Sequence, residues 1–167
     1  DHHRELRCGY PEVILCSGKS MDHIAKIAAE ILASEANLLA TRATIGAYER
    51  IRDLDRRARW HEPARCVTVV QHAPERLPGT AVVVTAGTSD FPVAEEARIT
   101  AETMGVRVRM IQDVGVAGIH RLLRHRRDME KADVVIVVAG MEGALPSVVG
   151  GLVRSPVIAV PTSVGYG

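Results

Sequence analysis

The chain has little of what marks several large classes of protein. Its three cysteines, Cys8, Cys16 and Cys66, are too scattered for a disulfide framework and form no CxxC pair of the kind that binds zinc. The formal net charge is only +1, so no basic field favours nucleic acid or an anionic membrane surface. The longest apolar runs fall far short of the ~20 residues that span a bilayer. We therefore expect a cytoplasmic protein with no nucleic-acid or membrane partner.

A complete P-loop is also lacking. Gly18-Lys19-Ser20 is similar to the end of that motif, but the upstream glycine that the motif requires would fall near Leu15 and is missing. The absence of that glycine excludes an NTPase of the P-loop class.

What the chain does have is three Val/Ile-rich runs that each lead into glycine and small polar residues. The runs are 81–85, 134–138 and 157–160, and the segments that follow them are 86–90, 139–147 and 161–167. Such runs are typical of strands buried on both faces of a parallel sheet. Ligands of these sheets bind beyond the carboxyl ends of the strands, where glycine permits a close approach to the backbone. The pattern, together with the segment 113–118, predicts a rim that holds a phosphorylated ligand.

The remaining segments alternate between strand and helix patterns. We expect further strands at 12–16, 37–41, 66–70 and 106–111. One helix is expected to begin after Ser20, and four more are expected at 47–57, 92–104, 118–127 and 144–153. The prolines and glycine of residues 73–79 break any regular element and mark a domain boundary. The sequence therefore predicts a small N-terminal α/β domain, 1–75, and a larger α/β domain, 76–167. Alternating strands and helices in the larger domain indicate a parallel sheet with helices on both faces.

The segment after the first run offers a candidate ligand site. Ser89 or Asp90 could simply cap the following helix. Alternatively, Thr88, Ser89 and the free N–H groups of the helix bind a phosphate or carboxylate, and Asp90 serves as a hydrogen-bond acceptor or metal ligand. Both interpretations fit the residues.

Two further segments of the rim contain ionisable side chains. His120 could be a structural hydrogen-bonding residue or a catalyst, and Arg121 could clamp a phosphate or belong to a solvated helix face with its arginine neighbours. The glycines of 139–147 make that loop pliant, and Ser147 offers a hydroxyl group. Glu142 is the one charged side chain in this loop, and it is either a general base or a solvated carboxylate.

Several phrases of the sequence resemble the LarB family, the pyridinium-3,5-biscarboxylic acid mononucleotide synthases of nickel-pincer cofactor synthesis. The phrases are residues 11–14, 18–19, 39–42, 85–97, 113–122 and 139–167. Residues 80–167 also resemble, more distantly, the PurE family of aminoimidazole ribonucleotide carboxylases and mutases. The resemblance implies a three-layer, flavodoxin-like parallel sheet and a homo-oligomer, an octamer in the PurE family.

The LarB resemblance implies a carboxylase-hydrolase that acts on nicotinic acid adenine dinucleotide. Carbon dioxide or bicarbonate is the co-substrate, AMP is released, and no tightly bound organic cofactor is expected. Magnesium could assist cleavage of the phosphoanhydride, with Asp90 as its ligand. The family's nucleophilic cysteine lies in an Asn-Ser-Cys segment downstream of the match to Gly165-Tyr166-Gly167, so we expect it beyond residue 167.

The resemblance also assigns roles to residues at matching positions. Glu142, Asp90 and His120 are the implied catalytic residues, and the implied substrate-binding residues are Gly87, Thr88, Ser89, Asp113, Arg121, Gly140 and Ser147. The PurE pattern has a histidine where this chain has Ala144, which favours the LarB interpretation. The alternatives are a PurE-type carboxylase or mutase and a non-catalytic nucleotide-binding module.

Overall fold

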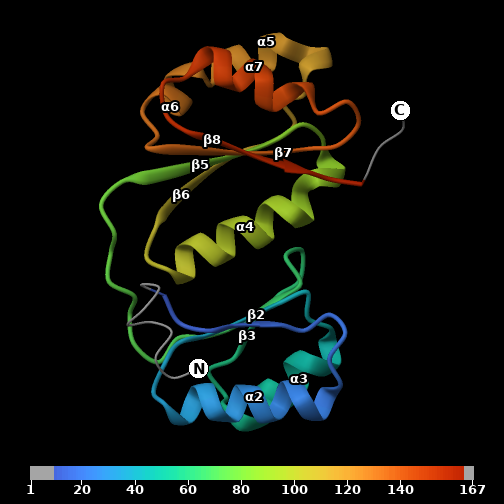
Figure 1. Ribbon diagram of the computed structural model, residues 1–167, viewed down its shortest axis with the longest axis vertical. Helices are drawn as coiled ribbons and strands as arrows, with labels where there is room; N and C mark the ends of the chain where they lie inside the picture. Colours follow the sequence, from blue (N-terminus) through green and yellow to red (C-terminus); the bar gives the residue numbers. More distant parts are fainter. Residues whose placement is uncertain (1–9, 164–167) are drawn as a thin grey trace. The chain divides into compact units, whose positions relative to one another are not determined.

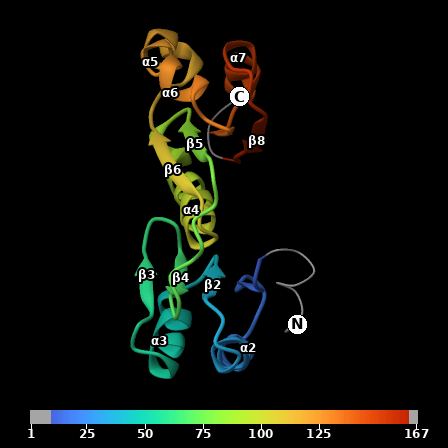
Figure 2. The ribbon, with the colours of Figure 1, turned by 90° about the vertical axis from the view of Figure 1, so that its left-hand side faces the viewer.

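A computed structural model describes residues 10–163 of the chain. The chain forms two compact units, residues 1–75 and 76–167, and each is built around its own four-stranded sheet (Figures 1 and 2). Cys8 and the Gly165-Tyr166-Gly167 match lie outside the described residues, so the third glycine-rich segment is described only as far as residue 163.

The N-terminal unit combines a parallel strand pair with an antiparallel hairpin. Its strands are β1 (Val13–Leu15), β2 (Leu38–Thr41), β3 (Arg59–His61) and β4 (Cys66–Val69), and its helices are α2 (Met21–Ala33) and α3 (Ile45–Leu54). The strand order is β1-β2-β4-β3, with only β1 and β2 parallel, because α2 returns the chain between them. Strand β3 was not predicted, since three residues that include an arginine and a histidine form no apolar run.

Side-chain caps set the start of both helices in this unit, and an aspartate stops the second. The Ser20 hydroxyl accepts from the His23 N–H at 3.3 Å, which confirms the predicted start of α2. Helix α3 begins two residues before the predicted position, at Ile45, and ends at Leu54 instead of residue 57. Asp55 accepts a hydrogen bond from the backbone N–H of Arg57 at 2.8 Å and so competes with continuation of the helix.

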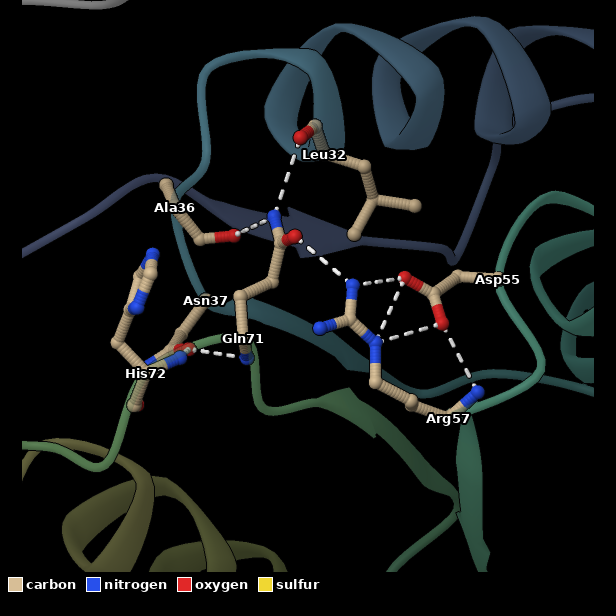
Figure 3. Close-up of polar contacts among 7 residues, drawn as sticks. All are labelled: Leu32, Ala36, Asn37, Asp55, Arg57, Gln71 and His72. Atoms are coloured by element: carbon tan, nitrogen blue, oxygen red, sulfur yellow. Dashed lines mark hydrogen bonds and ion pairs between the residues drawn. The ribbon is translucent and has the colours of Figure 1, made fainter.

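A network of hydrogen bonds connects the segment after β4 to the end of α2 (Figure 3). The Gln71 side chain donates to the carbonyls of Leu32 and Ala36 at 3.1 and 3.0 Å and accepts from Arg57 at 2.9 Å. The side-chain amide oxygen of Asn37 accepts from the Gln71 backbone N–H at 2.7 Å. The Leu32 carbonyl in the last turn of α2 and the Ala36 carbonyl just after the helix therefore find a hydrogen-bond partner on a segment remote in sequence.

The C-terminal unit is a wholly parallel sheet covered by helices on both faces. Its strands are β5 (Thr80–Thr85), β6 (Arg107–Ile111), β7 (Val134–Ala139) and β8 (Val157–Pro161). Helix α4 (Phe91–Thr103) covers one face, and the other face is covered by α5 (Ile119–Arg124), α6 (Arg126–Glu130) and α7 (Ala144–Leu152) (Figure 1). The predicted three-layer, flavodoxin-like sheet is thus confirmed.

The order of the strands creates a switch point between β5 and β7. The order is β6-β5-β7-β8, with β5 and β7 at the centre of the sheet. The chain therefore passes from β5 to one edge strand, β6, and later from β7 to the opposite edge strand, β8. Right-handed crossovers then send the segment after β5 to one face and the segment after β7 to the other. A crevice opens where such adjacent loops diverge.

Two expectations for this unit are wrong in detail. Strand β8 is not buried on both faces, because it lies at the edge of the sheet and Ile158 is 51% exposed. The helix predicted at 118–127 is two helices, α5 and α6, that meet at His125. The N–H of His125 bonds to the Leu122 carbonyl three residues back at 2.9 Å, which tightens and ends the last turn of α5.

None of the helices among residues 10–163 is long and apolar enough to cross a membrane.

Burial of α5 against the sheet predicts a contrast between two adjacent leucines. Leu122 is fully buried in the core that includes Val135 and Val137, whereas Leu123 is 46% exposed. Leu122→Ala should lower the free energy of unfolding by about 2–5 kcal/mol, since it leaves a cavity. Leu123→Ala, the matched control, should change it by less than about 1 kcal/mol. Urea titration followed by circular dichroism measures both, and equal losses would show that α5 is packed differently.

Candidate active site

A pocket of about 340 Å³ opens at the carboxyl ends of the strands of the C-terminal unit. Three loops form it, and they follow β5, β6 and β7. Its lining residues are Ala86, Gly87, Ser89, Asp90, Gly115, Val116, Ala117, Arg121, Ala139, Gly140, Met141, Glu142, Ala144 and Leu145. The volume lies within the range of about 300–1,000 Å³ that is usual for small-molecule sites. The pocket thus lies at the switch point between β5 and β7.

The pocket wall is mainly apolar and contains few polar side chains. Alanine, valine, leucine and methionine side chains make up most of it, while Ser89, Asp90, Arg121 and Glu142 supply the polar groups. A mainly apolar wall with a few polar groups that fix the orientation of the ligand is usual for small-molecule sites.

The loops after β5 and β6 meet backbone to backbone. The Gly115 N–H donates to the Ala86 carbonyl at 2.9 Å, and a Cβ built on Gly115 would lie 2.9 Å from that same oxygen. No side chain fits at this contact, so glycine is required there by the close approach.

Asp90 joins the loops that follow the first and third apolar runs. Its carboxylate is buried, with the residue 5% exposed. One oxygen accepts from the Gly87 N–H at 2.9 Å, and the other accepts from the Thr162 hydroxyl at 2.7 Å. Asp90 occupies the N-cap position of α4 without a capping hydrogen bond from its side chain to that helix, and its bond to the Gly87 N–H caps the preceding 3-10 turn, Thr88–Asp90, instead.

Thr162 is the site residue that sequence reasoning missed. Besides the bond to Asp90, its N–H donates to the Ala139 carbonyl at 3.0 Å, which ties the exit of β8 to the exit of β7. Its position among small polar residues after the third run was the available signal, but nothing local showed that its hydroxyl faces Asp90.

Arg121 belongs to the pocket and not to a solvated helix face. Its guanidinium donates to the Asp113 carboxylate at 2.5 Å, and the Asp113 N–H donates to the buried hydroxyl of Thr85 at 3.1 Å. The other arginines of the predicted cluster, Arg124, Arg126 and Arg127, are exposed, as the helix-face interpretation expects.

The loop after β7 brings Glu142 to the pocket in an unusual backbone conformation. Met141 has a φ of 55°, in the left-handed region, and the residue lines the pocket and is 57% exposed. Glu142 is exposed and lines the pocket, as does Ala144 at the position of the PurE histidine. An accessible carboxylate in this place can accept a proton from a bound ligand.

Four candidate residues do not line the pocket. Thr88, His120 and Ser147 are exposed and lie outside its wall, and Asp113 reaches it only through Arg121. Consecutive residues of a helix point about 100° apart. Because Arg121 of α5 faces the pocket, its neighbour His120 is directed elsewhere.

The residues do not fit a magnesium ion held at Asp90. Both oxygens of that carboxylate already accept hydrogen bonds within the protein, and the side chain is buried. Among residues 10–163, no group of three histidine, cysteine or acidic side chains could hold a metal ion. Magnesium usually needs carboxylate oxygens directed at the ion.

The two cysteines of the described chain lie in the N-terminal unit and are buried. Burial raises the pKa of the Cys16 thiol, an effect that the nearby Lys19 only partly opposes. A raised pKa leaves little thiolate at neutral pH, so Cys16 is poorly suited to act as a nucleophile.

Both units match family models of known proteins. Residues 80–166 match the AIR carboxylase family, and residues 1–72 match the LarB/PurE-like N-terminal domain. The fold and site therefore define an enzyme class with carboxylase or mutase chemistry on a PurE-like domain. With both domains in one chain, the protein belongs to the LarB family of that superfamily, which confirms the resemblance.

Two proteins of Methanocaldococcus jannaschii are similar to the chain. An uncharacterized protein is 42% identical over 177 aligned positions, which cover all of this chain and 68% of that relative. An N5-carboxyaminoimidazole ribonucleotide mutase is 38% identical over 82 positions, which cover 47% of this chain and 50% of the mutase. The second match supports the carboxylase-like class.

The Asp90–Thr162 contact predicts a selective effect of removing one hydroxyl group. Thr162→Val keeps the shape of the side chain but leaves a buried carboxylate oxygen without its donor, so the free energy of unfolding should fall by about 1–3 kcal/mol. Thr162→Ser keeps the hydroxyl and should retain most of the stability. Denaturant titration of the two variants tests this, and an equal loss in both would mean that the methyl group, not the hydrogen bond, matters.

The buried thiol predicts slow chemical labelling of Cys16 in the folded protein. At about pH 8, a thiol reagent such as iodoacetamide should modify Cys16 much more slowly than after unfolding in urea, because the raised pKa lowers the thiolate fraction. Labelling should increase as the pH rises above the ordinary thiol range. Peptide mapping by mass spectrometry reports the site, and rapid labelling of Cys16 in the native state would contradict the described burial.

Proposed function

We propose that this chain belongs to an enzyme that converts nicotinic acid adenine dinucleotide, carbon dioxide and water to pyridinium-3,5-biscarboxylic acid mononucleotide and AMP, a step of nickel-pincer cofactor synthesis. The family supplies the carboxylase-like class. The particular substrate and product rest on the site described above and on the LarB resemblance.

One observation carries the proposal: Glu142 and Ala144 both line the pocket. The methyl group of Ala144 cannot transfer a proton, so this chain lacks the histidine of the PurE pattern at that position. Glu142 offers a carboxylate two residues away in the same loop. The acid–base group at this site is then a carboxylate, which supports LarB chemistry over mutase chemistry.

The remaining pocket groups suit a pyridinium nucleotide. The apolar wall, which includes Val116 and Leu145, can pack against a planar aromatic ring. The carboxylates of Asp90 and Glu142 favour the positive charge of that ring, whereas Arg121 can pair with an anionic carboxylate or phosphate of the same ligand.

The proposed reaction needs covalent catalysis, because a cationic ring cannot itself attack an electrophile. A cysteine thiolate adds to a ring carbon, and the ring nitrogen takes up the electron pair. The enamine that results attacks carbon dioxide and forms the new C–C bond. A base removes the proton from the carboxylated carbon, the C–S bond breaks, and the pyridinium ring is restored. Water then cleaves the phosphoanhydride and releases AMP.

Three described residues of this chain would assist these reaction steps. Glu142 accepts the ring proton, and Arg121 holds an anionic group of the nucleotide. Asp90 keeps the loops after β5 and β8 together and so fixes the shape of the pocket. The nucleophilic cysteine is the one that the resemblance places after residues 165–167.

The proposal predicts a carboxylated product from the full-length gene product. With nicotinic acid adenine dinucleotide and isotopically labelled bicarbonate, mass spectrometry should find AMP and a mononucleotide that is heavier by one labelled carboxyl group. Glu142→Gln should slow product formation by about 10²–10⁴-fold, since a positioned base contributes that much. Glu130→Gln, which removes a surface carboxylate paired with Arg126, should leave the rate unchanged.

Other outcomes separate the alternatives. A pyridinium product without added carboxyl mass would sink the proposal. Turnover of aminoimidazole ribonucleotide or its carboxylated forms would instead establish the PurE-type activity. Tight nucleotide binding without any turnover would indicate a binding module.

A further inference from the structure

The guanidinium of Arg121 occupies the space next to Gly118 that a side chain at that position would fill. A Cβ built on Gly118 would lie 2.6 Å from the Arg121 Nε and 2.9 Å from its Nη2. Gly118 has φ −124° and ψ 53°, so no left-handed backbone requires glycine there. A side chain at this position would therefore force the end of the Arg121 side chain to move away.

A second contact fixes the other side of the same guanidinium. The Asp113 carboxylate accepts from Nη1 of Arg121 at 2.5 Å. Asp113 is itself anchored, since its N–H bonds to the fully buried Thr85 hydroxyl at 3.1 Å. Its φ of 56° lies in the left-handed region, which aspartate adopts more readily than most residues other than glycine. Asp113 does not line the pocket, whereas Arg121 does.

We propose that Asp113 is a positioning residue, which together with the missing side chain at Gly118 holds Arg121 ready to bind an anionic group in the pocket. A guanidinium has five N–H donors, and the contact with Asp113 uses one of them. The others stay available for a carboxylate or phosphate. The inference rests on the proposed function only in taking a nucleotide as the ligand.

Holding the arginine in advance strengthens binding, because less side-chain freedom is lost when the ligand arrives. The Asp113–Arg121 pair itself adds little to stability, since the side chains of Asp113 and Arg121 are 52% and 39% exposed. A positioning role and a structural role therefore predict different results when Asp113 or Gly118 is replaced. If the role is positioning, ligand binding weakens; if the role is structural, the stability of the fold falls.

The test is a double-mutant cycle on binding of nicotinic acid adenine dinucleotide, measured by isothermal titration calorimetry on the full-length protein. Asp113→Asn and Gly118→Ala should each weaken binding about 3- to 10-fold with little change in melting temperature. In the Arg121→Ala background, the same two substitutions should have no further effect. In the steady state they should raise KM and leave kcat nearly unchanged.

A matched control uses an ion pair of the same kind outside the pocket. Asp128 accepts from Arg109 at 2.7 Å, and neither residue lines the pocket. Asp128→Asn should leave nucleotide affinity unchanged. If Asp113→Asn and Gly118→Ala weakened binding equally with and without Arg121, their effect would not pass through the arginine and the inference would be overturned.

A readout without ligand separates this inference from the proposed function. In NMR spectra of the free protein, the Arg121 Nε–H signal should be sharp and shifted from the exposed-arginine position. It should move toward that position in Asp113→Asn and in Gly118→Ala, but not in Asp128→Asn. An Arg121 signal that is the same in all variants overturns the positioning role, even if the enzyme carboxylates the dinucleotide. Failure of the wild-type protein to bind the dinucleotide overturns the proposed function alone.

Discussion

The buried carboxylate of Asp90 is the contact on which the pocket depends. It accepts one hydrogen bond from the Gly87 backbone and one from the Thr162 hydroxyl, and these two residues follow strands that are not neighbours in the sheet. A buried charge is costly unless it is fully hydrogen-bonded. The two donors must therefore stay in place together, which fixes the exits of β5 and β8 on either side of β7 and gives the glycine-rich loops a defined shape.

The chemistry of the site follows from what these fixed loops present. The switch point in the strand order opens the crevice between the loops after β5 and β7, and apolar side chains line most of it. Into this wall the fold places one arginine and one accessible carboxylate, Arg121 and Glu142. Under the proposed function, the apolar wall would pack against the aromatic ring of the nucleotide, the arginine would hold an anionic group, and the carboxylate would accept a proton.

Much of the fold could be predicted because local pattern and burial agree. The Val/Ile runs of β5 and β7 have apolar side chains on both faces, and a parallel sheet covered by helices buries both. Helix α2 begins after Ser20 because the Ser20 hydroxyl accepts a hydrogen bond from a free N–H of the first turn. Prediction failed where the deciding partner is remote. The apolar run of β8 is the same kind of pattern as β7, but its place at the sheet edge leaves Ile158 exposed. Helix α3 stops early because the Asp55 side chain accepts the hydrogen bond of the Arg57 N–H, which a longer helix would direct to one of its own carbonyls.

The sequence by itself determined the alternation of strands and helices, the glycine-rich strand exits and the presence of Glu142 with Ala144 in one loop, because each depends on neighbours within a few residues. Only the tertiary structure decided which polar residues meet. It separates His120 from Arg121, although they are adjacent in the chain, because successive helical residues point in different directions. It also joins Asp90 to Thr162 across 72 positions, because hydrogen bonding of a buried charge is settled by the packing of whole strands.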